Sequence, residues 1–269
     1  MAACSTPFVE GGTFVRRIYL SGGCFINNAY PSSMLFELTP KTLTKPVKRK
    51  NMLLKRYGHC MIFLNNAIYS IGGFSHKDLP NEVPVTLASC ERYSIHENSW
   101  QYVSTMNESR AFSSAVTLDN QYIYVMGGLH DYTVIQTIEK YDSVSDAWLS
   151  VYFKLPVPLA KHGMVVVDNK SILICGGMSS DFEPTRTTYS LDLATVKWIK
   201  KSPMTHARLT AQGLFCTNGF VFAIGGNSEG ICERYNVDAD RWQRIPTFLG
   251  RIEGETSLYT FSLCMLRSS

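Results

Sequence analysis

Five Gly-Gly doublets, each at the end of an apolar run, constrain the fold of this chain more than any other feature. Their first glycines are 50, 55, 49 and 49 residues apart, a period typical of propellers and solenoids. Because the repeat tiles nearly all 269 residues, we expect a single domain, 1–269. The doublets are Gly22-Gly23, Gly72-Gly73, Gly127-Gly128, Gly176-Gly177 and Gly225-Gly226.

A second periodic feature follows four of the doublets, where an apolar residue precedes a tryptophan by seven positions. Turn-forming residues lie between the two members of each pair, and Asn, Asp or Gly turns precede the apolar run of the later doublets. Each unit therefore reads as four strands joined by hairpins, which predicts an all-β fold built from propeller blades. The pairs are Tyr93 and Trp100, Tyr141 and Trp148, Leu191 and Trp198, and Tyr235 and Trp242, with Phe36 and Leu43 in the first repeat.

This pattern resembles the kelch repeat, in which Gly-Gly is followed by Tyr, by Trp seven residues later, and then by Met or Pro and a basic residue. The segment from Pro203 to Arg208 shows the last part of the motif. The resemblance covers Phe14 to Trp242 and implies a kelch-type β-propeller of four-stranded antiparallel blades. The repeats run approximately over 14–51, 52–106, 107–156, 157–204 and 205–246.

The ends of the chain bear on the number of blades. Phe14 to Ser21 reads as the second strand of a blade, and 251–267 reads as a first strand without a doublet after it. Kelch propellers commonly close by pairing the two ends of the chain in one blade, which removes exposed sheet edges. We therefore favour five blades closed by the C-terminal strand 251–267. A six-bladed ring with one degenerate blade, or an open ring, is the alternative.

Cysteine usage and charge limit the compartment and the partners. The eight cysteines form no Cys-x-x-Cys pair, the N-terminus lacks the features of a signal peptide, and no apolar run reaches membrane-spanning length. We expect free thiols in a cytoplasmic protein without a membrane partner. The net charge of +4 does not imply nucleic-acid binding. The basic stretch Lys41 to Arg56 is either a nuclear signal or acidic-partner patch, or an outer strand whose lysines discourage edge pairing.

One basic residue precedes each strand that begins a repeat unit. The kelch resemblance implies that these residues surround the mouth of the propeller, on the face built by the loops that follow the second and fourth strands. Arginines there would favour carboxylates, so the expected partners are proteins with acidic segments. In the alternative interpretation each basic residue caps a neighbouring loop carbonyl. The five residues are Arg56, Arg110, Lys161, Arg208 and Arg251.

The loops after the second strands differ in length, and specificity on a fixed scaffold is usually encoded in such loops. Loop 74–86 contains Phe74 and His76, and loop 178–186 contains Phe182 and Arg186. The two phenylalanines are either exposed anchors for a partner or side chains that hold their own loops down. His130, which lies off the repeat pattern, completes the set of candidate partner-binding residues.

Catalysis is not indicated. His59, His162 and His206 recur at or near one point of the repeat, no histidine pair has close ligand spacing, and no Gly-x-Ser-x-Gly motif occurs. We therefore expect no cofactor, metal or small-molecule substrate. The leading hypothesis is a non-catalytic interaction module or scaffold subunit of a larger intracellular assembly, such as a cytoskeletal one, without an attached BTB domain. The alternative is an enzyme that uses the channel mouth, either a metal-dependent oxidase or a small-molecule isomerase or lyase.

Overall fold

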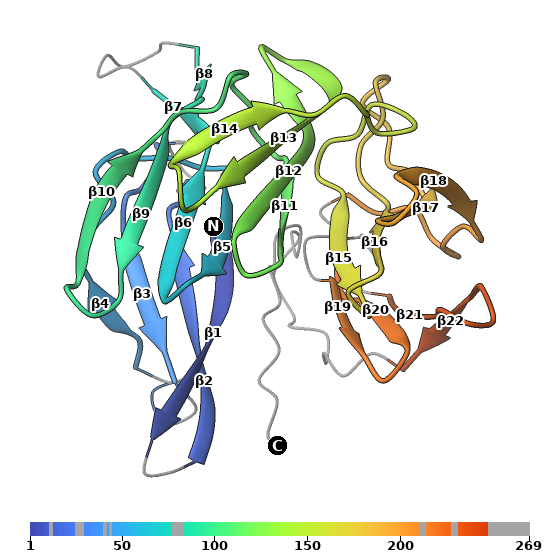
Figure 1. The fold of residues 1–269 in the computed structure, drawn as a ribbon, viewed down its shortest axis with the longest axis horizontal. Helices are drawn as coiled ribbons and strands as arrows, with labels where there is room; N and C mark the ends of the chain where they lie inside the picture. Colours follow the sequence, from blue (N-terminus) through green and yellow to red (C-terminus); the bar gives the residue numbers. More distant parts are fainter. Residues whose placement is uncertain are drawn as a thin grey trace, which may run out of the picture.

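The computed structural model describes residues 1–10, 13–24, 30–39, 42, 45–76, 83–209, 214–226 and 231–246. These residues form strands and turns and no helix. Twenty strands make five four-stranded antiparallel sheets, and two short strands make a sixth sheet. Figure 1 shows the five sheets following one another around the molecule. The predicted all-β propeller and its five blades are confirmed.

The blades follow one another along the chain, and each is described from its inner to its outer strand. Blade 1 contains β1 (Ala2–Glu10), β2 (Thr13–Ser21), β3 (Leu35–Leu38) and β4 (Val47–Arg49), and blade 2 contains β5 (Cys60–Leu64), β6 (Ala67–Ile71), β9 (Cys90–Ser94) and β10 (Ser99–Val103). Blade 3 contains β11 (Ser114–Leu118), β12 (Tyr122–His130), β13 (Thr133–Asp142) and β14 (Ala147–Ser150). Blade 4 contains β15 (Gly163–Val167), β16 (Ser171–Cys175), β17 (Thr188–Asp192) and β18 (Lys197–Lys201). Blade 5 contains β19 (Leu214–Thr217), β20 (Phe220–Ala223), β21 (Cys232–Asn236) and β22 (Arg241–Ile245), and the short sheet pairs β7 (Phe74–Ser75) with β8 (Val85–Thr86).

The entry of the chain into blade 1 differs from the prediction. Residues Ala2–Glu10 form the inner strand, with Ala2 opposite Ser21 and Glu10 opposite Thr13, so the chain does not begin at the second strand of a blade. The prediction failed because Ala, Cys, Ser and Thr dominate this segment and give no apolar pattern. Blade 1 thus has four strands of its own, and the predicted closing strand 251–267 lies outside the described residues.

The apolar core lies between neighbouring blades rather than within them. Separate clusters of buried side chains join blades 1 and 2, 2 and 3, 3 and 4, and 4 and 5. Tyr19 of blade 1 packs against Tyr93 of blade 2 at 6.2 Å, and Tyr69 of blade 2 packs against Tyr141 of blade 3 at 5.6 Å between ring centroids. Burial of such rings is the largest favourable term available to this fold.

The glycine doublets allow close approach between neighbouring blades. Gly72 has φ 61°, and a Cβ atom on it would collide with the carbonyl oxygen of Arg110 in the next blade. Gly127 meets the carbonyl oxygen of Leu159 in the same way. Only glycine combines this backbone conformation with this lack of space, which explains why the doublets mark the blades.

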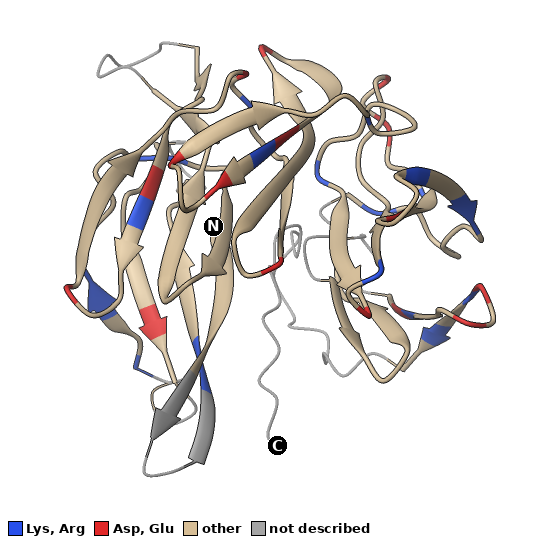
Figure 2. Ribbon diagram, in the orientation of Figure 1, with Lys and Arg blue, Asp and Glu red and all other residues tan. Residues whose placement is uncertain are grey.

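The basic stretch behaves as an outer strand. Residues Val47 and Lys48 of β4 are exposed, and Figure 2 shows Lys and Arg on the outer strands β4, β18 and β22. Charged outer strands discourage edge-to-edge pairing between molecules. The edge-strand interpretation of Lys41 to Arg56 therefore fits β4, whereas Arg56 at the end of the stretch is buried.

Candidate functional site

Three of the predicted binding arginines are enclosed in the blades. Arg56, Arg110 and Arg208 are 0, 0 and 1% exposed. Each forms an ion pair with a buried glutamate on the third strand of its own blade. The pairs are Arg56 and Glu91 at 2.8 Å, Arg110 and Glu139 at 2.8 Å, and Arg208 and Glu233 at 2.5 Å.

The remaining hydrogen bonds of these arginines are also internal. Arg110 Nη1 donates to the carbonyl oxygens of Gly127 at 3.0 Å and Thr137 at 3.1 Å. Glu139 in turn accepts hydrogen bonds from the backbone N–H groups of Asn107 and Glu108. The interpretation in which the basic residue caps loop carbonyls describes this geometry. The expectation that these arginines present their guanidinium groups to a partner is corrected, because none of the three reaches the surface.

The fourth basic residue, Lys161, does not occupy the arginine position. The second glycine of each of the first four doublets donates its N–H to a carbonyl oxygen of the next blade, and these acceptors are Arg56, Arg110, Leu159 and Arg208. Leu159 is therefore the blade 4 counterpart of the arginines. The glutamate position of blade 4 also differs. Tyr189 occupies it, because Tyr189 pairs with Ile174 as Glu139 of blade 3 pairs with Val125. The fifth basic residue, Arg251, lies outside the described residues.

Lys161 instead belongs to a row of corner residues at the inner edge of one face. Each corner lies two residues after the arginine position, at Gly58, Phe112 and Lys161. The N–H of Phe112 donates to the carbonyl oxygen of Gly58 at 2.6 Å, and the N–H of Lys161 donates to that of Phe112 at 2.7 Å. The three corners are thus connected from blade 2 to blade 4 by backbone hydrogen bonds.

The corner conformation is one that side chains rarely adopt. Gly58, Phe112 and Lys161 have φ values of 63, 53 and 52°. Tyr132 and Phe182, in the loops after the second strands of blades 3 and 4, have φ values of 65 and 63°. Bulky residues held in the left-handed region are strained, and such strain clusters at functional sites.

Aromatic rings from blades 1 to 3 meet beside these corners. The ring of Phe74 stacks on Tyr57 at 5.4 Å and on Tyr132 at 5.8 Å, and Phe112 meets Phe74 edge-on at 5.8 Å. His76 lies 6.4 Å from Tyr57 and 6.2 Å from Tyr30, measured between ring centroids. We call these six residues the aromatic cluster: Tyr30, Tyr57, Phe74, His76, Phe112 and Tyr132.

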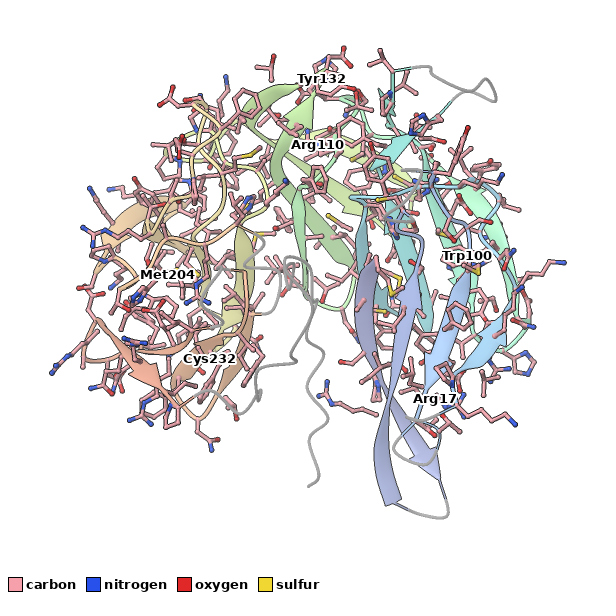
Figure 3. The ribbon with its side chains drawn as sticks, turned by 180° about the vertical axis from the view of Figure 1, so that it is seen from behind. Arg17, Trp100, Arg110, Tyr132, Met204 and Cys232 are labelled. Atoms are coloured by element: carbon pink, nitrogen blue, oxygen red, sulfur yellow. The ribbon has the colours of Figure 1, made fainter. Side chains whose placement is uncertain are left out.

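The aromatic cluster is buried at its centre and open at its ends. Phe74 is 3% exposed, whereas Tyr30 is 46% and Tyr132 is 48% exposed. Figure 3 shows Tyr132 at the upper edge of the molecule, with Arg110 below it among the strands. Tyr132 is fixed in place, because its hydroxyl donates to the carbonyl oxygen of Pro84 at 3.0 Å. The ends of the cluster therefore present aromatic surface to solvent.

Charged groups border the cluster on the blade 4 side. The Lys161 ammonium lies 4.6 Å from the centroid of the Phe112 ring, a cation–π contact. Burial lowers the pKa of Lys161 below its ordinary value and raises the pKa of Tyr57 to about 12. The tyrosine therefore stays protonated at neutral pH.

The predicted loop residues have different fates. Phe74 holds its own loop down, whereas Phe182 is 55% exposed at the tip of a tight loop closed by the bond from its N–H to Ser179. His76 is half-buried against Tyr57, and Nδ1 of His130 lies 2.9 Å from the Ser109 hydroxyl oxygen. Arg186 is exposed. The structure thus gathers Phe74 and His76 in one cluster. Phe182 and Arg186 are both accessible, in the same loop.

Four members of the cluster were not predicted from the sequence: Tyr30, Tyr57, Phe112 and Tyr132. The sequence carries a signal at Phe112. This aromatic residue stands two positions after Arg110, whereas a glycine, Gly58, stands two positions after Arg56. Tyr30 and Tyr132 carry no such signal, since they lie in loops of irregular length.

In the described part of the chain, no three His, Cys, Asp or Glu side chains lie together in a way that would hold a metal ion. The same residues include no helix long and apolar enough to cross a membrane.

Repeated four-stranded blades, doublets between blades and buried Tyr and Trp pairs together define a kelch-type β-propeller. Comparison with known proteins agrees with this class. The model of the Attractin/LZTR1 β-propeller family matches residues 18–251, and the chain belongs to that family.

Similar curated proteins include mouse Kelch-like protein 15, 28% identical over 211 residues, and rat Kelch-like protein 36, 25% identical over 263 residues. These matches cover 68 and 92% of this chain but only 33 and 39% of the relatives, so the chain spans between about a third and two fifths of their length. Among solved structures, that of YjhT superimposes with a TM-score of 0.63 at 15% identity, over 82% of this chain and 72% of that one. This last similarity concerns the fold alone.

Proposed function

We propose that this chain is a non-catalytic protein-interaction propeller that binds its partner through the aromatic cluster and the neighbouring loop tip at Phe182. The observation that carries the proposal is the aromatic cluster itself, which joins loops of three blades on one face and is open at Tyr30 and Tyr132. Exposed aromatic surface of this kind is typical of protein interfaces, where tyrosine and other aromatic residues supply much of the binding energy.

The bordering cations indicate the chemistry of the partner. Lys161 and the exposed Arg186 lie on blade 4, beyond the aromatic residues of blades 1 to 3. A segment with an apolar anchor for the rings and an acidic residue for these cations would complement both parts. The kelch-like relatives, which are matched over their propeller-sized portion, support an interaction role of this general kind. We propose an intracellular assembly, which the free thiols of Cys60, Cys90 and Cys175 support.

The test compares two sets of exposed aromatic residues. The double variant Tyr132→Ala with Phe182→Ala removes two of the accessible aromatic rings of the face and leaves Tyr30 in place. The control Tyr102→Ala removes a ring that is 57% exposed on the outer strand β10. We expect the double variant to weaken partner binding by about 30-fold or more, as loss of interface hot spots does, while the control binds normally.

Partners that co-purify from the native source would be quantified by mass spectrometry, and the dissociation constant would then be measured with the purified partner. Both variants should melt close to the parent protein, because neither removes a buried side chain. Loss of binding in Tyr102→Ala alone would place the interface on the outer rim and contradict the proposal.

A further inference from the structure

A polar clamp recurs at three of the joints between blades. In blades 2, 3 and 5 the tyrosine of the third strand donates its hydroxyl hydrogen to an Asn or Asp five residues later. The pairs are Tyr93 and Asn98 at 2.7 Å, Tyr141 and Asp146 at 2.7 Å, and Tyr235 and Asp240 at 2.6 Å.

The same Asn or Asp also holds the preceding blade. Its side-chain oxygen accepts the backbone N–H of the residue that follows the outer strand of that blade. These donors are Lys50 to Asn98 at 3.0 Å, Ser104 to Asp146 at 3.0 Å, and Ser202 to Asp240 at 2.9 Å. Each clamp thus fastens a tyrosine ring into the space between two blades.

Blade 4 lacks the clamp that would join it to blade 3. Leu191 stands at the tyrosine position, since it pairs with Ile172 and Trp198 as Tyr141 pairs with Ile123 and Trp148. Val196 stands at the Asn or Asp position and keeps the left-handed backbone with φ 54°, which is costly for a β-branched residue. No carboxylate or amide is left there to hold the neighbouring blade.

The tryptophan of blade 4 shows the same loss. Trp148 Nε1 donates to the carbonyl oxygen of Ser104 at 2.9 Å, and Trp100 Nε1 donates to that of Lys50 at 2.9 Å. Trp198 Nε1 is buried and makes no hydrogen bond. In place of the clamp, the joint between blades 3 and 4 has apolar contacts, which include Leu155, Leu159 and Ile172, beside its backbone hydrogen bonds.

A cleft of about 620 Å³ opens at this joint, on the side of the turns between first and second strands and thus opposite the aromatic cluster. Its apolar lining comes from Leu118, Tyr124 and Leu193. Asp119, Asn120 and Asn169 stand at its rim, and all three are exposed. A volume of this size is typical of small-molecule sites.

The position of Tyr124 explains the cleft. Tyr124 lies three residues before the first glycine of its doublet, as Tyr69 does in blade 2. Tyr69 is 3% exposed because the ring of Tyr141 covers it at 5.6 Å, but Tyr124 has only Leu191 at the corresponding place and remains half-buried. The cleft is therefore lined by the tyrosine that lacks its covering ring.

We propose that this cleft binds a small aromatic molecule that carries an amine, with the ring placed against Tyr124, Leu118 and Leu193 and the amine at the Asp119 carboxylate. The ring replaces the aromatic surface that the other clamped joints obtain from their own tyrosine. Asp119 is the one charged residue of the described lining, so a cationic or neutral donor is favoured over an anion. The site is independent of the interaction face proposed above.

The test uses tyramine as the probe and isothermal titration calorimetry on the full chain. We expect saturable binding that weakens at least tenfold when hexylamine, which has the charge without the ring, replaces tyramine. The variant Leu191→Tyr with Val196→Asn restores the repeat residues and should abolish binding. If that variant does not fold, Leu193→Asn changes a half-buried lining residue and should weaken binding at least tenfold.

The converse variant, Tyr141→Leu with Asp146→Val, copies blade 4 into blade 3 and should create a second tyramine site beside Tyr69. Asp119→Asn should weaken tyramine binding by up to about fivefold, which is the effect of an exposed ion pair. Absence of tyramine binding by the parent chain, or equal binding by the parent and the Leu193→Asn variant, would overturn the proposal.

Discussion

Blades 3 and 4 share one backbone plan and use opposite chemistry to hold it. Blade 3 encloses the Arg110 and Glu139 ion pair and clamps Tyr141 to Asp146. Blade 4 has Leu159 and Tyr189 at the positions of this ion pair, and Leu191 and Val196 at the positions of the clamp. Both partners of each polar pair have been exchanged together, so no charge is left buried alone.

This difference shows that a blade of this propeller can be held by a buried polar network, as in blade 3, or by less polar residues at the same positions, as in blade 4. Replacing both members of a buried ion pair by apolar residues costs little, whereas removing one member strands the other. A cleft opens at the joint that lacks the clamp.

The largest expected effect comes from stranding one charge in blade 3. Glu139→Ala leaves the Arg110 guanidinium, which is 0% exposed, with only the partly exposed Glu108 carboxylate at 3.2 Å, and should destabilise the fold by up to about 3–5 kcal/mol. Urea unfolding would measure this loss. Glu183→Ala, at an exposed loop position on blade 4, is the control and should change stability by less than about 0.5 kcal/mol. If both variants changed the free energy of unfolding by an equally small amount, the ion pair of blade 3 would not be needed for stability.

The second effect is a pH dependence that blade 4 has and blade 3 lacks. His162 is 0% exposed, and burial lowers its pKa from 6.5 to about 4. As the pH falls below about 6.5, the unfolded chain binds a proton at this histidine, whereas the folded chain binds it only near pH 4. The stability that the neutral histidine contributes is therefore complete above pH 6.5 and is lost as the pH falls towards 4. The loss amounts to about 3 kcal/mol over that window.

The matched variant for this effect is His162→Ser, which copies Ser113 at the corresponding point of blade 3. The free energy of unfolding would be measured at pH 7 and at pH 4.5 for both proteins. The variant should be less stable at pH 7 and should lose less stability on acidification than the parent does. Parallel pH curves would show that another group causes the acid sensitivity.

The smallest effect is expected from grafting the blade 3 ion pair into blade 4. Leu159→Arg with Tyr189→Glu supplies both charges, and we expect stability to stay the same or to fall by about 1 kcal/mol, because the two kinds of pairing are often nearly equivalent. The midpoint of urea unfolding would measure this change. A gain above about 1 kcal/mol would show that the ion pair itself stabilises the blades.

The sequence predicted the blades well because blade spacing is a local property. The doublets and the offset of seven between Tyr141 and Trp148 depend on hairpins of fixed length, and these pairs lie opposite each other in the structure. The inner strand of blade 1 was missed because Ala2–Glu10 contains few large apolar residues.

The candidate site was harder to predict because burial depends on residues far apart in the chain. Arg110 is enclosed through Glu139, which lies 29 positions away, and no local pattern reveals that pairing. Lys161 was aligned with the arginines because the true counterpart, Leu159, carries no charge. Phe74 and Phe182 look alike in sequence, yet one fills the aromatic cluster and the other stands exposed, since loop geometry rather than residue type decides between them.

The row of corner residues has a consequence for how such a surface diversifies. Gly58, Phe112 and Lys161 share one left-handed conformation and one pattern of backbone bonds, and yet they are a residue without a side chain, an aromatic ring and a cation. The main chain alone makes the connection, so residues of different chemistry share one backbone geometry, although a Cβ atom on Gly58 would come within 2.8 Å of the Phe112 ring. The inner rim of this propeller thus carries different chemistry from blade to blade on one backbone plan.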